Sequence, residues 1–181
     1  MGFQDELPDV RHNYSMLRDP SLIPLSHQHQ HALALCVRIE RAEVRGEDDL
    51  RAWRQEIDQI FAQEIRHHFA AEEAVLFPRA QEFDALITLV EELTAEHGSL
   101  RADFAAAGAG TLDERRLRDF AQRLAGHIRK EERRLFEELQ KLLTGEELKE
   151  LGRQIEEALK AVNTSCLLPN ERTRLRPKDE S

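Results

Sequence analysis

The stretch His68-Phe-Ala-Ala-Glu72-Glu-Ala-Val-Leu-Phe77 occurs a second time, with its key residues in register, as His127-Ile-Arg-Lys-Glu131-Glu-Arg-Arg-Leu-Phe136. In both copies a histidine is followed four residues later by a glutamate. Residues i and i+4 lie one turn apart on the same face of an α-helix. Each copy therefore predicts an imidazole and a carboxylate that converge on one site, and the repeat predicts a site with two matching halves.

Each copy is preceded by a segment with a single histidine in its apolar helical stripe. On a helical wheel, His29 and His97 lie at the centres of the stripes of these two segments. His68 is also flanked by apolar residues, whereas His127 lies towards the edge of its stripe, with Glu131 nearer the middle. The histidines that fall outside the stripes are expected at the surface: His27, His31 and His67.

Helical patterns extend over most of the chain. Helices are expected at about residues 23–44, 49–77, 83–107, from a cap at Thr111 or Asp113 to 143, and 146–162, with Pro78 ending or kinking the second. Four long helices joined by short loops predict an all-α, antiparallel up-down-up-down four-helix bundle with an accessory C-terminal helix. The expected organisation is an irregular N-terminal arm (1–21), the bundle (22–145), the accessory helix (146–162) and a flexible tail (163–181).

The composition narrows the classes of function. The 181 residues suffice for one domain with its own core, and 26 basic against 35 acidic residues give a formal charge of -9, which disfavours nucleic acid and anionic membranes as partners. No apolar stretch reaches the length of a membrane span and the N-terminus lacks the basic start of a signal peptide, so we expect a cytoplasmic protein. Cys36 and Cys166 make no disulfide framework. Cys36 is expected to be a small core residue beneath His29, or a redox-sensitive thiol.

The inward residues form an unusual core. Two carboxylates and four imidazoles buried among apolar side chains are costly unless they are compensated. Two metal ions would supply the missing positive charge. For each histidine taken singly, a hydrogen-bonded core residue is the ordinary alternative, and a structural bundle with an empty polar core is the alternative for the whole set.

The chain resembles the hemerythrin-like HHE cation-binding family over residues 22–143. The resemblance rests on the segments Pro24-Leu-Ser-His-Gln-His29, His68 to Pro78, Glu96-His97 and His127-Ile-Arg-Lys-Glu131-Glu. It implies two iron ions, bridged by two carboxylates and an oxo or hydroxo group, with Zn or Mn as substitutes that N/O ligands also accept. The metal ligands it implies are His29, His68, Glu72, His97, His127 and Glu131, with Glu72 and Glu131 as bridges.

Two departures from the oxygen-carrying members bear on function. Those members have a second histidine one turn after the third-helix ligand, where this chain has Arg101, and they space the last pair as His-x-x-x-x-Asp rather than His-x-x-x-Glu. Reversible oxygen storage is therefore disfavoured. The resemblance implies a protein that binds, reduces or senses O2, peroxide or NO, and these small molecules are the expected partners.

Alternatives stay open at the level of function. An iron or zinc storage or sensing module without turnover fits the same residues. Because the sequence shows no catalytic motif beyond the metal pair, it does not decide whether the protein is an enzyme. A second copy of the chain, bound through helix 146–162 or the tail, is a candidate partner.

Residues around the predicted site have expected roles as well. Glu64 is a candidate extra ligand or an acceptor for an imidazole N–H. Arg101 is expected to pair with a carboxylate such as Glu64, or to extend to solvent at the bundle end. Glu73 and Glu132 are expected on solvated faces, and Tyr14 is a candidate to cover the mouth of the bundle.

Overall fold

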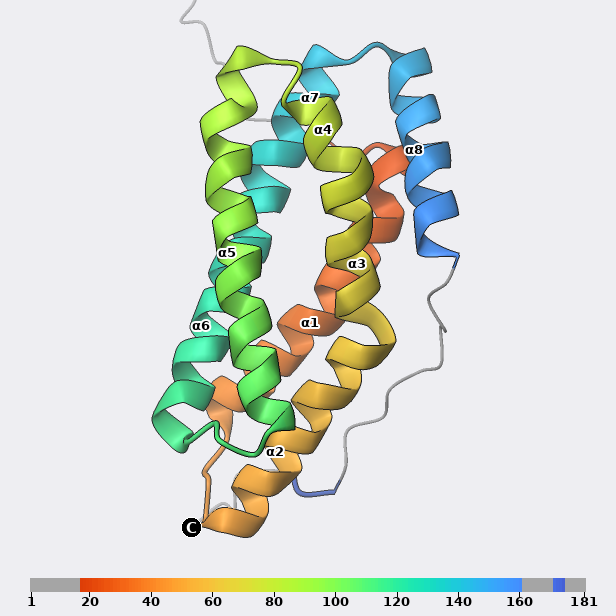
Figure 1. The fold of residues 1–181 in the computed structure, drawn as a ribbon. Coiled ribbons are helices and arrows are strands. Elements are labelled where there is room, and N and C mark those ends of the chain that lie inside the picture. Colours follow the sequence, from red (N-terminus) through yellow and green to blue (C-terminus); the bar gives the residue numbers. More distant parts are fainter. Residues whose placement is uncertain (1–16, 161–170, 175–181) are drawn as a thin grey trace, which may run out of the picture.

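The computed structural model describes residues 17–160 and 171–174. Its helical columns follow the chain, each running opposite to the one before it (Figure 1). The first column consists of the short 3-10 helix η1 (Pro20–Leu22) and α1 (Ile23–Arg41). The second column consists of α2 (Glu47–Ile60), the π-helical turn η2 (Phe61–Ile65), α3 (Arg66–Ala71), the π-helical turn η3 (Glu72–Leu76) and α4 (Phe77–Ala80). The third column is α5 (Asp84–Gly108), the fourth consists of α6 (Glu114–Lys130), the π-helical turn η4 (Glu131–Leu135) and α7 (Phe136–Leu142), and a further helix, α8 (Gly145–Leu159), follows. The prediction of an all-α four-helix bundle is confirmed.

The second column continues past the proline that was expected to end or kink it. Pro78 is the second residue of α4, directly after the π-helical turn η3, and the helix runs on to Ala80. Proline has no backbone N–H, so it removes one hydrogen bond from a helix. Pro78 follows a π-turn, where the backbone hydrogen bonds already change from the α-helical to the π-helical pattern, and the helix therefore tolerates the loss. The prediction that the helix ends at Phe77 is therefore wrong.

Other helix ends differ from expectation by a few residues. The first helix ends at Arg41, before the predicted end at Val44, and the fifth covers Gly145–Leu159. Asp113, rather than Thr111, caps the fourth column by accepting a hydrogen bond from the backbone N–H of Arg116. Tyr14 and the predicted tail ranges 163–170 and 175–181 lie outside the described residues.

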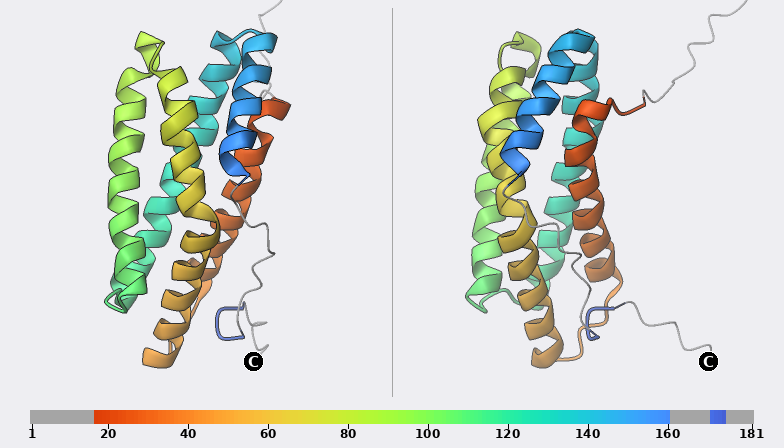
Figure 2. Two further views of the ribbon diagram at one scale, coloured as in Figure 1. Left: turned by 45° about the vertical axis from the view of Figure 1, so that its right-hand side comes forward. Right: turned by 90° about the vertical axis from the view of Figure 1, so that its right-hand side faces the viewer.

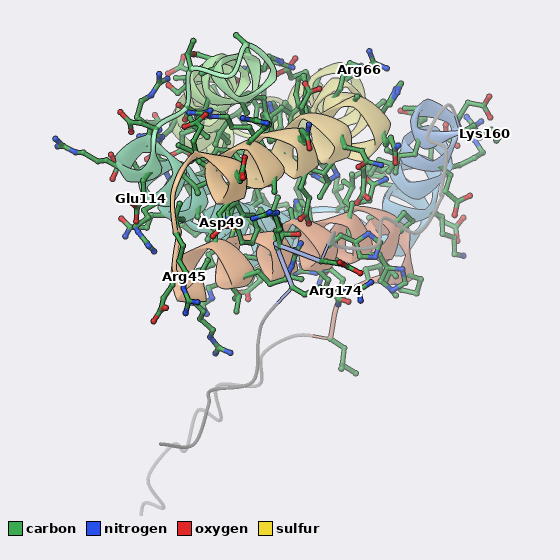
Figure 3. The ribbon with its side chains drawn as sticks, turned by 90° about the horizontal axis from the view of Figure 1, so that it is seen from below. Arg45, Asp49, Arg66, Glu114, Lys160 and Arg174 are labelled. Atoms are coloured by element: carbon green, nitrogen blue, oxygen red, sulfur yellow. The ribbon has the colours of Figure 1, made fainter. Side chains whose placement is uncertain are left out.

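The core divides into two apolar clusters along the bundle. The lower cluster includes Trp53, Phe69 and Phe104, and the upper cluster includes Leu25 and Phe136. The exposed side chains of Arg66, Glu114 and Lys160 point outward in the view from below (Figure 3). The layer between the two clusters is where the predicted polar residues lie.

The helix α8 covers the upper half of the bundle from outside. It packs against η1, α3 and η3, beside the start of the first column (Figure 2). Leu148, Leu151 and Ile155 are its buried contribution to the upper cluster. The expected accessory helix is therefore part of the closed upper core.

Gly152 permits the close approach of α8 to the start of the chain's first column. A Cβ at this position would lie 2.7 Å from Cβ and 2.8 Å from Cα of Ser21. We expect Gly152→Ala to lower the free energy of unfolding by about 1–3 kcal/mol, because backbone atoms must move. Urea unfolding measures the change. Gly98→Ala is the control, since no atom lies within 4 Å of its added Cβ, and it should leave stability unchanged or raise it. Equal effects of the two changes would contradict this packing.

Within the described residues, no helix combines the length and the apolar character needed to cross a membrane.

Candidate metal centre

The six predicted residues lie in one buried layer between the two apolar clusters. Each helical column contributes one histidine, and the second and fourth add one glutamate each. The exposed fractions of their surfaces are His29 3%, His68 2%, Glu72 0%, His97 0%, His127 2% and Glu131 0%. His127, placed at the edge of its stripe by the helical wheel, is as buried as the others.

The layer contains two overlapping groups of potential metal ligands. His29 and His68 form one group with Glu72 and Glu131, and His97 and His127 form the second with the same two glutamates; within each group the donor atoms lie within 4.8 Å of one another. The Nε2 atoms are 2.9 Å apart in the first histidine pair and 3.0 Å apart in the second. Two nitrogens about 2.1 Å from one ion, at a right angle, would lie about 3 Å apart.

Each carboxylate turns one oxygen to each histidine pair. In Glu72, Oε1 lies 3.1 Å from Nε2 of His68 and Oε2 lies 3.4 Å from Nε2 of His97. In Glu131, Oε2 lies 3.2 Å from Nε2 of His29 and Oε1 lies 3.2 Å from Nε2 of His127. This division of the oxygens is the arrangement that lets a carboxylate bridge two ions.

The four carboxylate oxygens lack hydrogen-bond partners among the described residues, although they are fully buried. Burial lowers the pKa of His29, but the carboxylates of Glu131 and Glu132 outweigh it and raise that pKa to about 9. Burial likewise opposes protonation of His127, and Glu131 together with Glu96 raises its pKa to about 10. The layer thus attracts positive charge, and the oxygens without donors fit bound cations.

The outer nitrogen of every layer histidine has a hydrogen-bond acceptor. The Nδ1 contacts are His29 to Glu132 at 2.7 Å, His68 to Gln28 at 2.7 Å, His97 to Glu73 at 2.8 Å and His127 to Glu96 at 2.9 Å. A proton on Nδ1 leaves the Nε2 lone pair free to face the centre of the layer. Glu73 and Glu132, which were expected on solvated faces, are partly exposed, with side-chain exposures of 32% and 24%. What was not expected is that each also holds a buried imidazole.

These contacts follow the internal repeat. The second glutamate of each copy, Glu73 or Glu132, binds the lone histidine of the other half of the chain. Gln28, which precedes His29, accepts a hydrogen bond from His68, and Glu96, which precedes His97, accepts one from His127. The Glu-Glu doublet, present in both copies, was the sequence signal for the outer glutamates.

A family model matches residues 24–139, which is more than half of the chain and includes all six layer residues, and it describes the hemerythrin HHE cation-binding domain. The chain belongs to the hemerythrin HHE cation-binding domain family. No curated protein and no solved structure matches the chain at a significant level.

Cationic side chains hold the outer carboxylates of this HHE domain. Arg101 pairs with a carboxylate, which was one of its two expected roles, but the partner is Glu73 instead of Glu64, with donated hydrogen bonds of 2.8 and 2.9 Å. Arg18 donates to Glu132 at 2.7 Å and lies over the ring of Phe136. Although burial raises the pKa of Glu132, hydrogen bonds from His29 and Ser26 and the charge of Arg18 lower it to about 2. These carboxylates are therefore ionised acceptors.

Glu64 lies outside both ligand groups. Its two carboxylate oxygens each lie 3.2 Å from Nδ1 of His31, a side chain that is 67% exposed. The carboxylate thus contacts a surface histidine, one of those expected outside the stripes, instead of an imidazole of the layer.

Replacing Arg101 tests whether this arginine, by holding Glu73 in place, helps to position His97 for metal binding. We expect Arg101→Gln to weaken metal binding by about tenfold, because Glu73 is no longer held in place as the acceptor of the His97 N–H. The side chain of Arg101 is 39% exposed, so the free energy of unfolding of the metal-free chain should change by less than about 1 kcal/mol. Competition titration with a chelator gives the affinity. Arg115→Gln, on a side chain that is 91% exposed, is the control, and an equal loss in both variants would contradict the role of Arg101.

Aromatic rings close the layer to solvent. Phe69 stacks on His97 with ring centroids 3.8 Å apart, and Phe77 stacks on the same imidazole with ring centroids 5.3 Å apart. Phe136 stacks on His29 at 5.6 Å. Two of the three π-turns in the described residues, η3 and η4, begin at Glu72 and Glu131. Each adds about one residue to its turn, so that the glutamate and the following Leu-Phe pair all face inward.

Cys36 is a buried thiol of the lower cluster, as the core interpretation predicted. Burial raises its pKa to about 12, so at pH 8 only about one molecule in ten thousand carries the reactive thiolate. In a Cys166→Ser variant, where Cys36 is the remaining cysteine, we expect no alkylation of the folded protein by iodoacetamide within hours and full alkylation in urea. Mass spectrometry measures both, and rapid modification of the folded chain would show instead that Cys36 is the redox-sensitive thiol.

Proposed function

We propose that this HHE domain holds two iron ions between its four columns, with Glu72 and Glu131 as bridging ligands, and that it binds, reduces or senses O2, peroxide or NO. The observation that carries the proposal is the division of each carboxylate between two histidine pairs. His29 and His68 would bind one ion, and His97 and His127 the other. Zinc or manganese are the substitutes that this donor set also accepts.

The number of protein donors supports reactivity with small ligands. Each ion would receive two imidazoles and one oxygen from each of two carboxylates. Iron prefers more ligands than these four, so positions remain for a small molecule and a bridging oxygen. A di-iron centre, when bound, supplies the electrons and the open positions for oxygen chemistry.

The surrounding residues define what the chain itself contributes. The outer acceptors fix each imidazole with Nε2 inward, and the stacked phenylalanines exclude bulk water from the layer. Arg101 occupies the place of the extra histidine of oxygen carriers, and its guanidinium is bound to Glu73, so it provides no donor to the ions. This difference favours redox chemistry or sensing over reversible oxygen storage.

The test is the metal content of the full chain purified from its native host, together with its absorption spectrum in air. We expect about two irons per chain with oxo-to-iron charge-transfer bands in the near ultraviolet. The reduced protein should then change its spectrum on addition of peroxide or NO. Zinc, or a single iron, without peroxide consumption would favour the storage or sensing module. A chain that takes up no metal even after reconstitution would overturn the proposal.

A further inference from the structure

The two halves of the centre differ at one pair of equivalent positions. His127 donates its Nδ1 proton to the carboxylate of Glu96 at 2.9 Å, whereas His68 donates to the amide oxygen of Gln28 at 2.7 Å. Gln28 and Glu96 each directly precede the lone histidine of their half. The repeat therefore places an uncharged acceptor in one half and a charged acceptor in the other.

The cations around the outer acceptors do not cancel this difference. Arg18 pairs with Glu132 and Arg101 pairs with Glu73, so each of these carboxylates has a cation of its own. Lys130 contacts Glu96 at 2.5 Å but also binds Glu92, so this single cation is shared by two carboxylates. The acceptor of His127 is therefore a carboxylate that shares its cation with Glu92, whereas the acceptor of His68 is an amide without charge.

A charged acceptor strengthens the imidazole that it holds. A carboxylate on Nδ1–H draws the proton towards itself and increases the electron density at Nε2, which makes the imidazole a better donor to a cation. An amide oxygen does so less, because it carries no net charge. The four inner histidines are otherwise matched, since the remaining pair, His29 and His97, both donate to carboxylates.

We propose that the two metal positions are unequal, with the His97/His127 position binding the first ion and the His29/His68 position binding the second, more weakly held ion. Gln28 and Glu96 are the positioning residues that set this order. The inference rests on the proposed function, because it requires two ions in the layer. The ion at the His29/His68 position is therefore the one that exchanges more readily.

The test titrates the metal-free full chain with Zn²⁺ in the presence of a competing chelator and resolves two binding constants. We expect Gln28→Glu to tighten the second constant by about tenfold, and Glu96→Gln to weaken the first by about tenfold. Both exchanges preserve side-chain size. Gln30→Glu and Glu91→Gln, exposed residues on the same two helices, make the same changes of charge and should leave both constants unchanged.

NMR of the histidine rings identifies which position fills first. With one equivalent of Zn²⁺, the Nε2 resonances of His97 and His127 should move, and those of His29 and His68 should follow with the second equivalent. Movement of His29 and His68 first, or unchanged constants in both Gln28→Glu and Glu96→Gln, would overturn the unequal positions while leaving the dimetal centre in place. A wild-type chain that binds no Zn²⁺ and no iron would overturn the centre as well.

Discussion

If the layer holds two ions as proposed, Glu131→Gln is expected to reduce the metal content to at most one ion per chain. Both oxygens of Glu131 are buried without hydrogen-bond partners among the described residues, and each faces a different histidine pair. Glutamine keeps the size of the side chain but removes the negative charge and replaces one donor oxygen with an amide nitrogen. Both proposed metal positions would therefore lose a shared anionic ligand, and we expect affinity to fall by at least about 100-fold.

Metal analysis after dialysis against a weak chelator measures this effect. Glu138→Gln is the matched control, because this glutamate follows in the same column with a side chain that is 47% exposed and pairs with Lys141. The control should retain two ions. If Glu131→Gln also retained two ions with unchanged affinity, Glu131 would not be a bridging ligand.

Phe69→Ala is expected to have the largest effect on stability among the residues that contact the layer. Phe69 is 1% exposed, belongs to the lower cluster and stacks on His97 at 3.8 Å, with His127 at 5.8 Å from its centroid. Removing a buried phenyl ring leaves a cavity that the surrounding helices fill only in part. We expect the free energy of unfolding of the metal-free chain to fall by about 3–5 kcal/mol.

Urea unfolding followed by circular dichroism gives the change. Phe61→Ala is the control, because Phe61 is only half-buried and stacks on Phe104 in the lower cluster. It should cost less and leave metal affinity unchanged, whereas Phe69→Ala should also weaken metal binding because His97 loses its packing. A loss below about 1 kcal/mol for Phe69→Ala would contradict the close packing of this ring.

Much of the fold and of the layer could be predicted because both depend on helical periodicity. Apolar residues at helical spacing, interrupted by short loops, predict four helices that pack side by side. His29, His68, Glu72, His97 and Glu131 lie on these stripes, and the structure buries all of them in one layer. That they bind metal stays a prediction for the metal titrations.

The helical wheel was less accurate where the helices depart from a constant turn. It placed His127 at the edge of its stripe, yet His127 is 2% exposed. The π-turn η4 (Glu131–Leu135) follows His127 in the same column and shifts the buried stripe there. The same kind of turn before Pro78 explains why the second column continues to Ala80.

The sequence by itself determined most of the side chains that face inward, because facing depends on local spacing along each helix. Only the tertiary structure decided which partners lie behind them, because those contacts join residues far apart in the chain. Glu132 reaches His29 across 103 positions, and Arg18 reaches Glu132 across 114. A single helical wheel contains no information about a neighbouring helix, so the roles of Glu73 and Glu132 and the difference between Gln28 and Glu96 emerged only when the columns were packed together.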